Sequence, residues 1–128
     1  MNPDSLLTLL TAMGRTGYLD RSGGYGVVRV IERLNQKTST GLTFAQVWDP
    51  VNNWNQAWEV AAWLLNQRPD GEFTWFEIVS RSVYAMRNDD VNDPVPIFRY
   101  EHNGTPTGLR EAVIKAACMV AESMRCAE

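Results

Sequence analysis

The chain has 128 residues, of which 45% are apolar and 21% are charged, and this composition predicts one folded domain around one hydrophobic core and excludes bulk disorder. The formal net charge of −3 provides no basic field for a phosphate backbone, so direct, non-specific nucleic-acid binding is excluded. No apolar run approaches the roughly 20 residues of a membrane span, and no basic segment precedes the N-terminal leucines, so we expect a cytoplasmic protein without a membrane partner.

The first 40 residues are predicted to form a helical N-terminal region. Asn2 can cap a first helix, Pro3 is tolerated at its first position, and Gly14 can end it. The segment from residue 15 to residue 26 contains four glycines and is predicted to be a loop.

The pattern changes after this loop. Apolar residues at 27, 30, 31 and 34 follow the i, i+3, i+4, i+7 spacing and favour an amphipathic helix. Three of these four residues are β-branched, which keeps a strand as the alternative.

Residues 41–128 are predicted to form a sheet with two helices. Strands are expected at 42–48, at 72–83 with both faces covered, and at 95–101, antiparallel to the strand at 72–83. A helix over 54–67 is expected to bury Trp54, Ala57, Trp58, Ala61, Leu64 and Leu65. Thr105 and Pro106 indicate the start of a closing helix that reaches residue 125. The predicted fold class is a single α+β domain, in which a small antiparallel sheet is covered by helices in a sandwich-like arrangement.

Reactive groups are sparse in the sequence. His102 is the single histidine, and neither a serine nor Cys118 is placed beside it by any motif. The zinc patterns CxxC and HExxH are absent. We therefore expect no catalytic residues, no metal site, no cofactor and no enzymatic activity, with a reaction controlled by His102 as the alternative.

Two glycine-containing stretches precede predicted helices, where free backbone amides could hold an anion. The candidate residues are Gly24 and Gly26 in the first stretch and Thr105, Thr107 and Arg110 in the second. Neither stretch matches the P-loop pattern. These residues carry an alternative function, the sequestration of a phosphorylated nucleotide signal.

The helix over 54–67 also presents a tryptophan on its polar side. Trp63 falls with Gln56 and Glu59, opposite the apolar stripe, and an exposed indole indicates a protein partner. The loop carrying Asp89, Asp90 and Asp93 is a second candidate contact, since its charge suits a basic groove on the partner. A homo-oligomer could use the same tryptophan, and burial of Trp63 in the core is the competing interpretation.

Three further features carry a resemblance to a family. These are Asn55-Gln56-Ala57-Trp58-Glu59-Val60, the aromatic strand after it, and the entry Thr105-Pro106-Thr107-Gly108-Leu109-Arg110-Glu111-Ala112 into a helix of small residues. Over about residues 48–122 the chain resembles the phage ABA-sandwich domain proteins, whose pattern has a helix carrying Ala-Trp-Glu-Val, a strand pair and an Ala-rich closing helix.

This resemblance implies a phage or prophage accessory protein acting in the cytoplasm of a host bacterium. It carries no catalytic residue across. It implies a protein that binds and inhibits a host protein or protein complex, and a component of a defence system such as a CRISPR complex is the expected kind of target.

Overall fold

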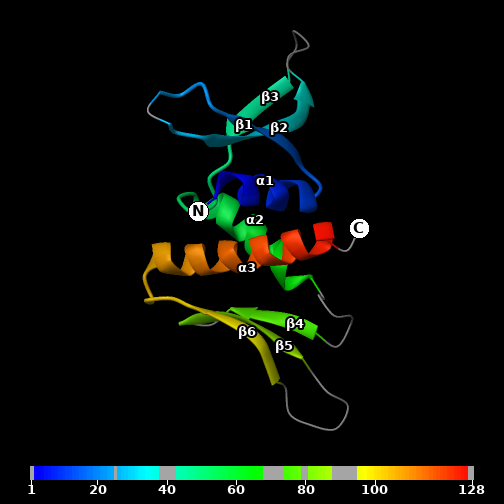
Figure 1. Ribbon diagram of the computed structural model, residues 1–128, viewed down its shortest axis with the longest axis vertical. Helices are drawn as coiled ribbons and strands as arrows, with labels where there is room; N and C mark the ends of the chain where they lie inside the picture. The colour runs from blue at the N-terminus through cyan, green and yellow to red at the C-terminus, as the bar shows by residue number, and fades with distance from the viewer. Residues whose placement is uncertain are drawn as a thin grey trace. The chain divides into compact units, whose positions relative to one another are not determined.

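The computed structural model describes residues 2–24, 26–37, 43–67, 74–78, 81–87 and 95–126. Along the chain the elements are α1 (Pro3–Ala12), β1 (Thr16–Asp20), β2 (Arg29–Lys37), β3 (Thr43–Val47), α2 (Trp54–Leu65), β4 (Thr74–Ile78), β5 (Ser82–Arg87), β6 (Val95–Glu101) and α3 (Pro106–Cys126). Helices and small antiparallel sheets together make this an α+β protein, as the sequence predicts (Figure 1).

The chain divides into two compact units. The first comprises residues 1–49 together with the residues from 121 onward, and the second comprises residues 50–120. Each unit contains a three-stranded antiparallel sheet, in the order β1-β2-β3 in the first and β4-β5-β6 in the second.

The first helix forms for the reasons that the sequence indicates. The Asn2 side chain accepts a hydrogen bond of 2.9 Å from the backbone N–H of Asp4, Pro3 is the first helical residue, and Gly14 follows the C-cap with a φ of 81°. Leu6, Leu9 and Leu10 are buried. Within the first unit, α1 lies against β1 and β2 and covers that sheet.

The helical prediction for residues 27–36 is wrong, and the strand alternative is confirmed. β2 occupies this segment and pairs with β1 on one side and β3 on the other. The predicted loop at 15–26 likewise contains β1. Pairing on both edges satisfies the backbone of β2, and the β-branched Val30 and Ile31 suit a strand, so tertiary context overrides the helical spacing.

One carboxylate is buried in the first unit. Glu32 on β2 is 4% exposed and pairs with Arg15 at 3.5 Å between Nη1 and Oε2. The side-chain amide of Gln46 on β3 donates a hydrogen bond of 2.9 Å to Glu32 Oε1. These partners compensate the buried charge, so Glu32 links the segment before β1 to the sheet.

Trp48 follows β3 and is buried more completely than any other tryptophan that the structure describes. It is 1% exposed, and its backbone N–H donates a hydrogen bond of 2.8 Å to Val30 O. Its indole Nε1 is buried and has no hydrogen-bond acceptor. The ring therefore contributes to the structure by apolar packing.

The second unit corrects another prediction. The single strand expected over 72–83 is two strands, β4 and β5, which pair antiparallel with Ile78 opposite Val83. Alternating apolar residues look alike in one long strand and in two short ones, and the sequence has no glycine, asparagine or proline between these two. β5 is the central strand, and β6 pairs antiparallel with it.

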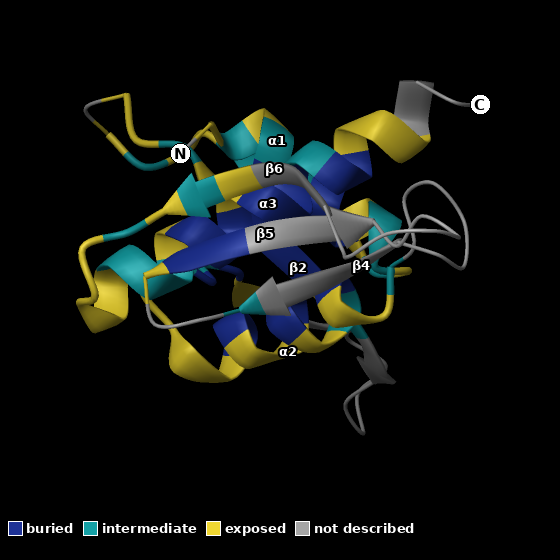
Figure 2. Cartoon of the chain, turned by 90° about the horizontal axis from the view of Figure 1, so that it is seen from below, coloured by how far each residue is buried: buried dark blue, intermediate teal, exposed yellow. Residues whose placement is uncertain are grey.

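α3 begins at the predicted position. Thr105 Oγ1 accepts a hydrogen bond of 3.0 Å from the backbone N–H of Gly108, and Pro106 is the first helical residue. The buried side of α3 consists of Ala112, Val113, Ile114, Ala116, Ala117, Cys118, Val120 and Ala121. Figure 2 shows buried residues along the middle of this helix and exposed residues toward its C-terminal end. Glu111 and Lys115 are exposed, as expected for its polar side.

Gly17 gives a test of the packing in the first unit. A Cβ at this position would lie 2.5 Å from the backbone oxygen of Ile31 and 2.6 Å from Leu10 Cδ2. Because the Ile31 oxygen belongs to the paired strand and cannot rotate away, Gly17→Ala is expected to lower the free energy of unfolding by about 1–3 kcal/mol. Chemical denaturation measures this difference.

Gly24 provides the matched control. A Cβ there would meet no atom within 4 Å, so Gly24→Ala should leave the free energy of unfolding within about 0.5 kcal/mol of the parent. Equal stability of the two variants would contradict the close contact at Gly17.

Candidate functional site

Helix α2 carries the main candidate surface. It starts after Asn53, whose side chain accepts a hydrogen bond of 3.1 Å from the backbone N–H of Gln56. The buried positions are Gln56, Ala57, Val60, Ala61 and Leu64. At 100° per residue these five positions span one side of the helix, and Figure 2 shows α2 buried along one side and exposed along the other.

Two tryptophans lie outside this buried side. Trp58 is 67% exposed and Trp54 is 44% exposed, although both are predicted above to face the core. The expected exposed set is also corrected, because Gln56 is 7% exposed and Trp63 is half-buried, whereas Glu59 is exposed as predicted. The sequence correctly indicates an exposed tryptophan on this helix but selects the wrong one.

The error has a physical cause. Apolar residues occupy most of the circumference of α2, so the periodicity fixes a helix without fixing which side is buried. The buried side is centred on Val60 and Leu64, which are 0% exposed, and the small residues Ala57 and Ala61 separate it from the side that carries Trp54 and Trp58.

Trp54 and Trp58 border an apolar pocket within the second unit. The lining residues are Trp54, Ala57, Trp58 and Ala61 of α2, Ile78 of β4, and Leu109, Arg110 and Val113 of α3. The pocket contains about 320 Å³ of space, part of it open to solvent. The two indole rings stand 6.4 Å apart between centroids and are tilted by 30°, which is a favourable aromatic geometry.

Arg110 is the one charged residue among the described residues that line the pocket. Its guanidinium carbon lies 4.4 Å from the centroid of the Trp54 ring. Its Nε donates a hydrogen bond of 2.6 Å to Val51 O, and one Nη2 hydrogen bond reaches Thr107 Oγ1 at 3.3 Å. The cation–π contact and the hydrogen bonds therefore fix both the guanidinium and the indole in place.

The described lining of the pocket is chemically unreactive. None of the described residues that line it has a nucleophilic, acid–base or metal-ligating side chain. Within the ranges that the structure describes, no three histidine, cysteine, aspartate or glutamate side chains gather as a metal site would require. The pocket can exclude water from an apolar group and place a positive charge beside it.

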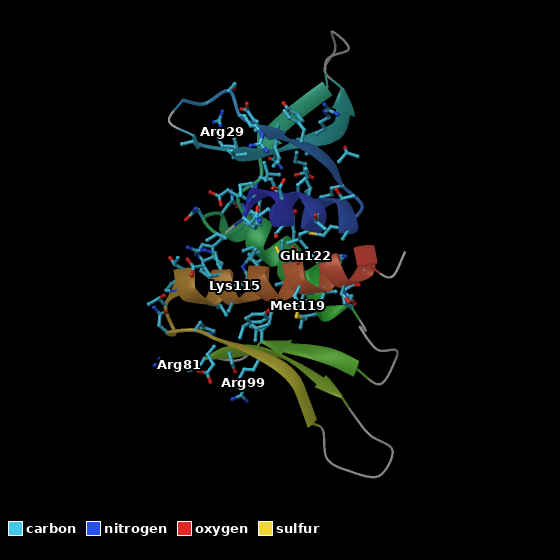
Figure 3. The ribbon with its side chains drawn as sticks, in the orientation of Figure 1. Arg29, Arg81, Arg99, Lys115, Met119 and Glu122 are labelled. Atoms are coloured by element: carbon cyan, nitrogen blue, oxygen red, sulfur yellow. The ribbon has the colours of Figure 1, made fainter. Side chains whose placement is uncertain are left out.

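The first predicted anion site is not formed as expected. Gly24 and Gly26 lead into strand β2 rather than into a helix, so no helix N-terminus presents its amides there. The segment is held instead by Asp20, which accepts hydrogen bonds from the hydroxyl and the backbone N–H of Ser22. Arg29 Nη2 lies 2.9 Å from Asp20 Oδ2 (Figure 3).

These contacts generate a pH dependence. Hydrogen bonds from the Ser22 hydroxyl, the Ser22 amide and Arg29 hold the pKa of Asp20 below its ordinary value. A lowered pKa in the folded state stabilises the fold above the unfolded pKa of about 3.9 and loses this effect as the pH falls through the folded value.

We expect the difference in unfolding free energy between the parent and Asp20→Asn to be constant above about pH 5 and to shrink below about pH 3.9. Urea denaturation at a series of pH values measures this difference. A difference that grows on acidification would contradict the hydrogen-bond pattern.

The second predicted anion site lies at the start of α3, but its groups are already engaged. The Thr105 hydroxyl caps Gly108 N–H and also donates to Asn103 Oδ1 at 2.6 Å. Arg110 is directed to Val51 and Trp54, as described above. The Gly104 amide donates a hydrogen bond of 3.1 Å to His102 Nδ1, so the histidine side chain is part of the turn.

A second arginine, Arg81, also contacts this turn. Arg81 Nη1 donates a hydrogen bond of 3.1 Å to the backbone oxygen of Asn103, and its guanidinium lies against Gly104. Figure 3 shows Arg81 and Arg99 at the β4–β5–β6 sheet of the second unit. These hydrogen bonds hold the turn that leads into α3.

Nucleotides should therefore not stabilise the protein. We expect an unchanged melting temperature with a panel of nucleoside mono-, di- and triphosphates and cyclic dinucleotides. A ligand at a hundredfold excess over its Kd would add about 2.7 kcal/mol to the unfolding free energy. A clear rise in melting temperature with any of them would restore the nucleotide-binding alternative.

The remaining predicted contact, the acidic loop with Asp89, Asp90 and Asp93, lies outside the described residues. Among the helices that the structure does describe, none has the length and apolar content needed to cross a membrane.

The site has no counterpart that would name its function. Comparison of the chain with protein-family models, curated proteins and solved structures finds no match. The resemblance to the phage ABA-sandwich domain proteins stays a prediction. The tryptophans and the pocket beside them are therefore the observations from which a function can be inferred.

Sequence reasoning placed Trp54 and Trp58 in the core and assigned Arg110 to an anion. One available signal was the i, i+4 spacing of the two tryptophans, paired with the same spacing of Ala57 and Ala61. When large residues line one side of a helix and small residues line the neighbouring side, the side with the small residues can be the one that is buried. Arg110 and Trp54 are 56 positions apart in the sequence, so no local pattern indicates their contact.

Proposed function

We propose that this protein is a non-catalytic binding protein that holds another protein at the surface formed by Trp54, Trp58 and the adjoining pocket. The observation that carries the proposal is the exposure of Trp58, at 67%, beside a pocket with an almost wholly apolar lining. Tryptophans that fill or border such pockets are the residues most often found to dominate the energy of protein interfaces.

The surface extends beyond one ring. Leu65 on the same side of α2 is 42% exposed, and Trp54 is 44% exposed. Single exposed apolar residues are common on protein surfaces, but here two indoles and a leucine lie along one side of the same helix. The rigid stacking of Arg110 on Trp54 keeps part of this area ordered before binding, which lowers the entropic cost of association.

The kind of partner is taken from the family resemblance. The likeness to the phage ABA-sandwich domain proteins over about residues 48–122 supports a host protein as the target. Binding would then inhibit that host protein by occluding its surface, and a defence component such as a CRISPR complex fits this role. The site needs no reactive group for such a function.

The proposal can be tested by photo-cross-linking. A photoreactive phenylalanine analogue in place of Trp58 should form a discrete adduct with a host protein when irradiated in lysate. Lys115, which is labelled in Figure 3, is the control position: it is exposed and, at 100° per residue, falls on the side of α3 away from Leu109 and Val113. The same analogue at Lys115 should not form that adduct.

The identified partner then permits a quantitative test. Trp58→Ala should raise the Kd about 30-fold or more and lower the free energy of unfolding by no more than about 1.5 kcal/mol, the contribution of its ring pair with Trp54. Equal cross-linking at both positions would contradict the site. An adduct consisting of two copies of this chain would instead assign the surface to a homodimer.

A further inference from the structure

The pocket beside Trp58 combines two recognition elements. In the part of the chain that the structure describes, its walls are side chains of tryptophan, alanine, isoleucine, leucine and valine, and Arg110 is the ionic group that lines it. The space of about 320 Å³ includes open solvent, so the pocket is a shallow depression rather than an enclosed small-molecule site. Such a depression suits a single apolar side chain better than an extended ligand.

Arg110 has N–H groups that are not used in the described hydrogen bonds. A guanidinium carries five N–H groups, and those of Arg110 that hydrogen-bond within the described part of the chain are Nε, to Val51 O, and one at Nη2, to Thr107 Oγ1. Both acceptors are uncharged, and no carboxylate among the described residues pairs with this arginine. Within the described ranges, its positive charge is therefore balanced by the Trp54 ring rather than by a carboxylate.

The local field adds to this positive charge. Arg110 is the fifth residue of α3, and the first turn of that helix contains no acidic residue. The N-terminal end of a helix favours a negative charge nearby. Arg110 as a residue is half-buried, and three contacts hold its guanidinium, so a carboxylate would meet a pre-positioned fork rather than a mobile side chain.

We propose that this site binds a peptide segment of the partner protein in which an apolar side chain enters the pocket and a nearby carboxylate pairs with Arg110. This inference rests on the proposed function and specifies the chemistry of the partner. Charge complementarity selects the occupant: a carboxylate beside the apolar side chain would supply the counter-charge that the described hydrogen-bond acceptors of Arg110 do not.

Selection from a random peptide library tests the inference. The purified full-length protein is the bait, and peptides that also bind Trp58→Ala are removed. The retained peptides should contain Asp or Glu within about three residues of Leu, Ile, Met or Phe. The same selection with Arg110→Gln should retain the apolar residue and lose the acidic one.

A double-mutant cycle gives the quantitative form. Replacing the peptide's acidic residue by its amide should weaken binding to the parent about tenfold or more, because hydrogen bonds between charged groups are lost. The same replacement should have little effect on binding to Arg110→Gln. Arg110→Lys should recover only part of the affinity, since it keeps the charge but loses the planar fork.

The outcomes separate this inference from the proposed function. Peptides that require Trp58 but show no excess of acidic residues would overturn the role of Arg110 and leave the binding surface intact. If no peptide depends on Trp58, the inference is wrong, while the cross-linking experiment decides the proposed function on its own. Should Arg110→Gln fail to fold, the acid-to-amide change in the peptide still gives the answer with the parent protein, since an undiminished affinity would refute the pairing.

Discussion

The stacking of Arg110 on Trp54 is the interaction on which the candidate surface depends. The arginine joins three separate pieces of the second unit, since it starts from α3, reaches the backbone before α2 at Val51 and covers the first tryptophan of α2. Without this contact the indole of Trp54 could adopt other rotamers, and the wall of the pocket that it forms would be lost. An element of packing thereby also prepares a surface for binding.

The two units use polar groups in different ways. In the first unit, charged side chains pair with one another: Glu32 pairs with Arg15, and Asp20 pairs with Arg29. The Gln46 amide also donates a hydrogen bond to Glu32. In the second, Arg110 pairs with carbonyl, hydroxyl and aromatic groups and retains its net charge. Internal pairing stabilises a sheet, whereas a held but uncompensated cation is suited to an external anion.

Local signals in the sequence predicted the helix ends, and non-local pairing decided the rest. Asn2, Pro3 and Thr105 act within a few residues of themselves, so the starts of α1 and α3 could be predicted. Residues 29–37 have spacing compatible with a helix, and only their pairing with β1 and β3 makes them a strand. The burial of α2 depends likewise on residues far away in the chain, which is why the exposed tryptophan was misassigned.

The contrast between Trp48 and Trp58 has a spectroscopic consequence. One indole is 1% exposed with an Nε1 proton that meets no acceptor, and the other is 67% exposed. The enclosed ring should emit at shorter wavelength and its imino proton should exchange slowly with deuterium, since exchange there requires an opening of the fold. The signal of Trp48 should therefore report on unfolding of the first unit, and the emission of Trp58 should change when a molecule binds at α2.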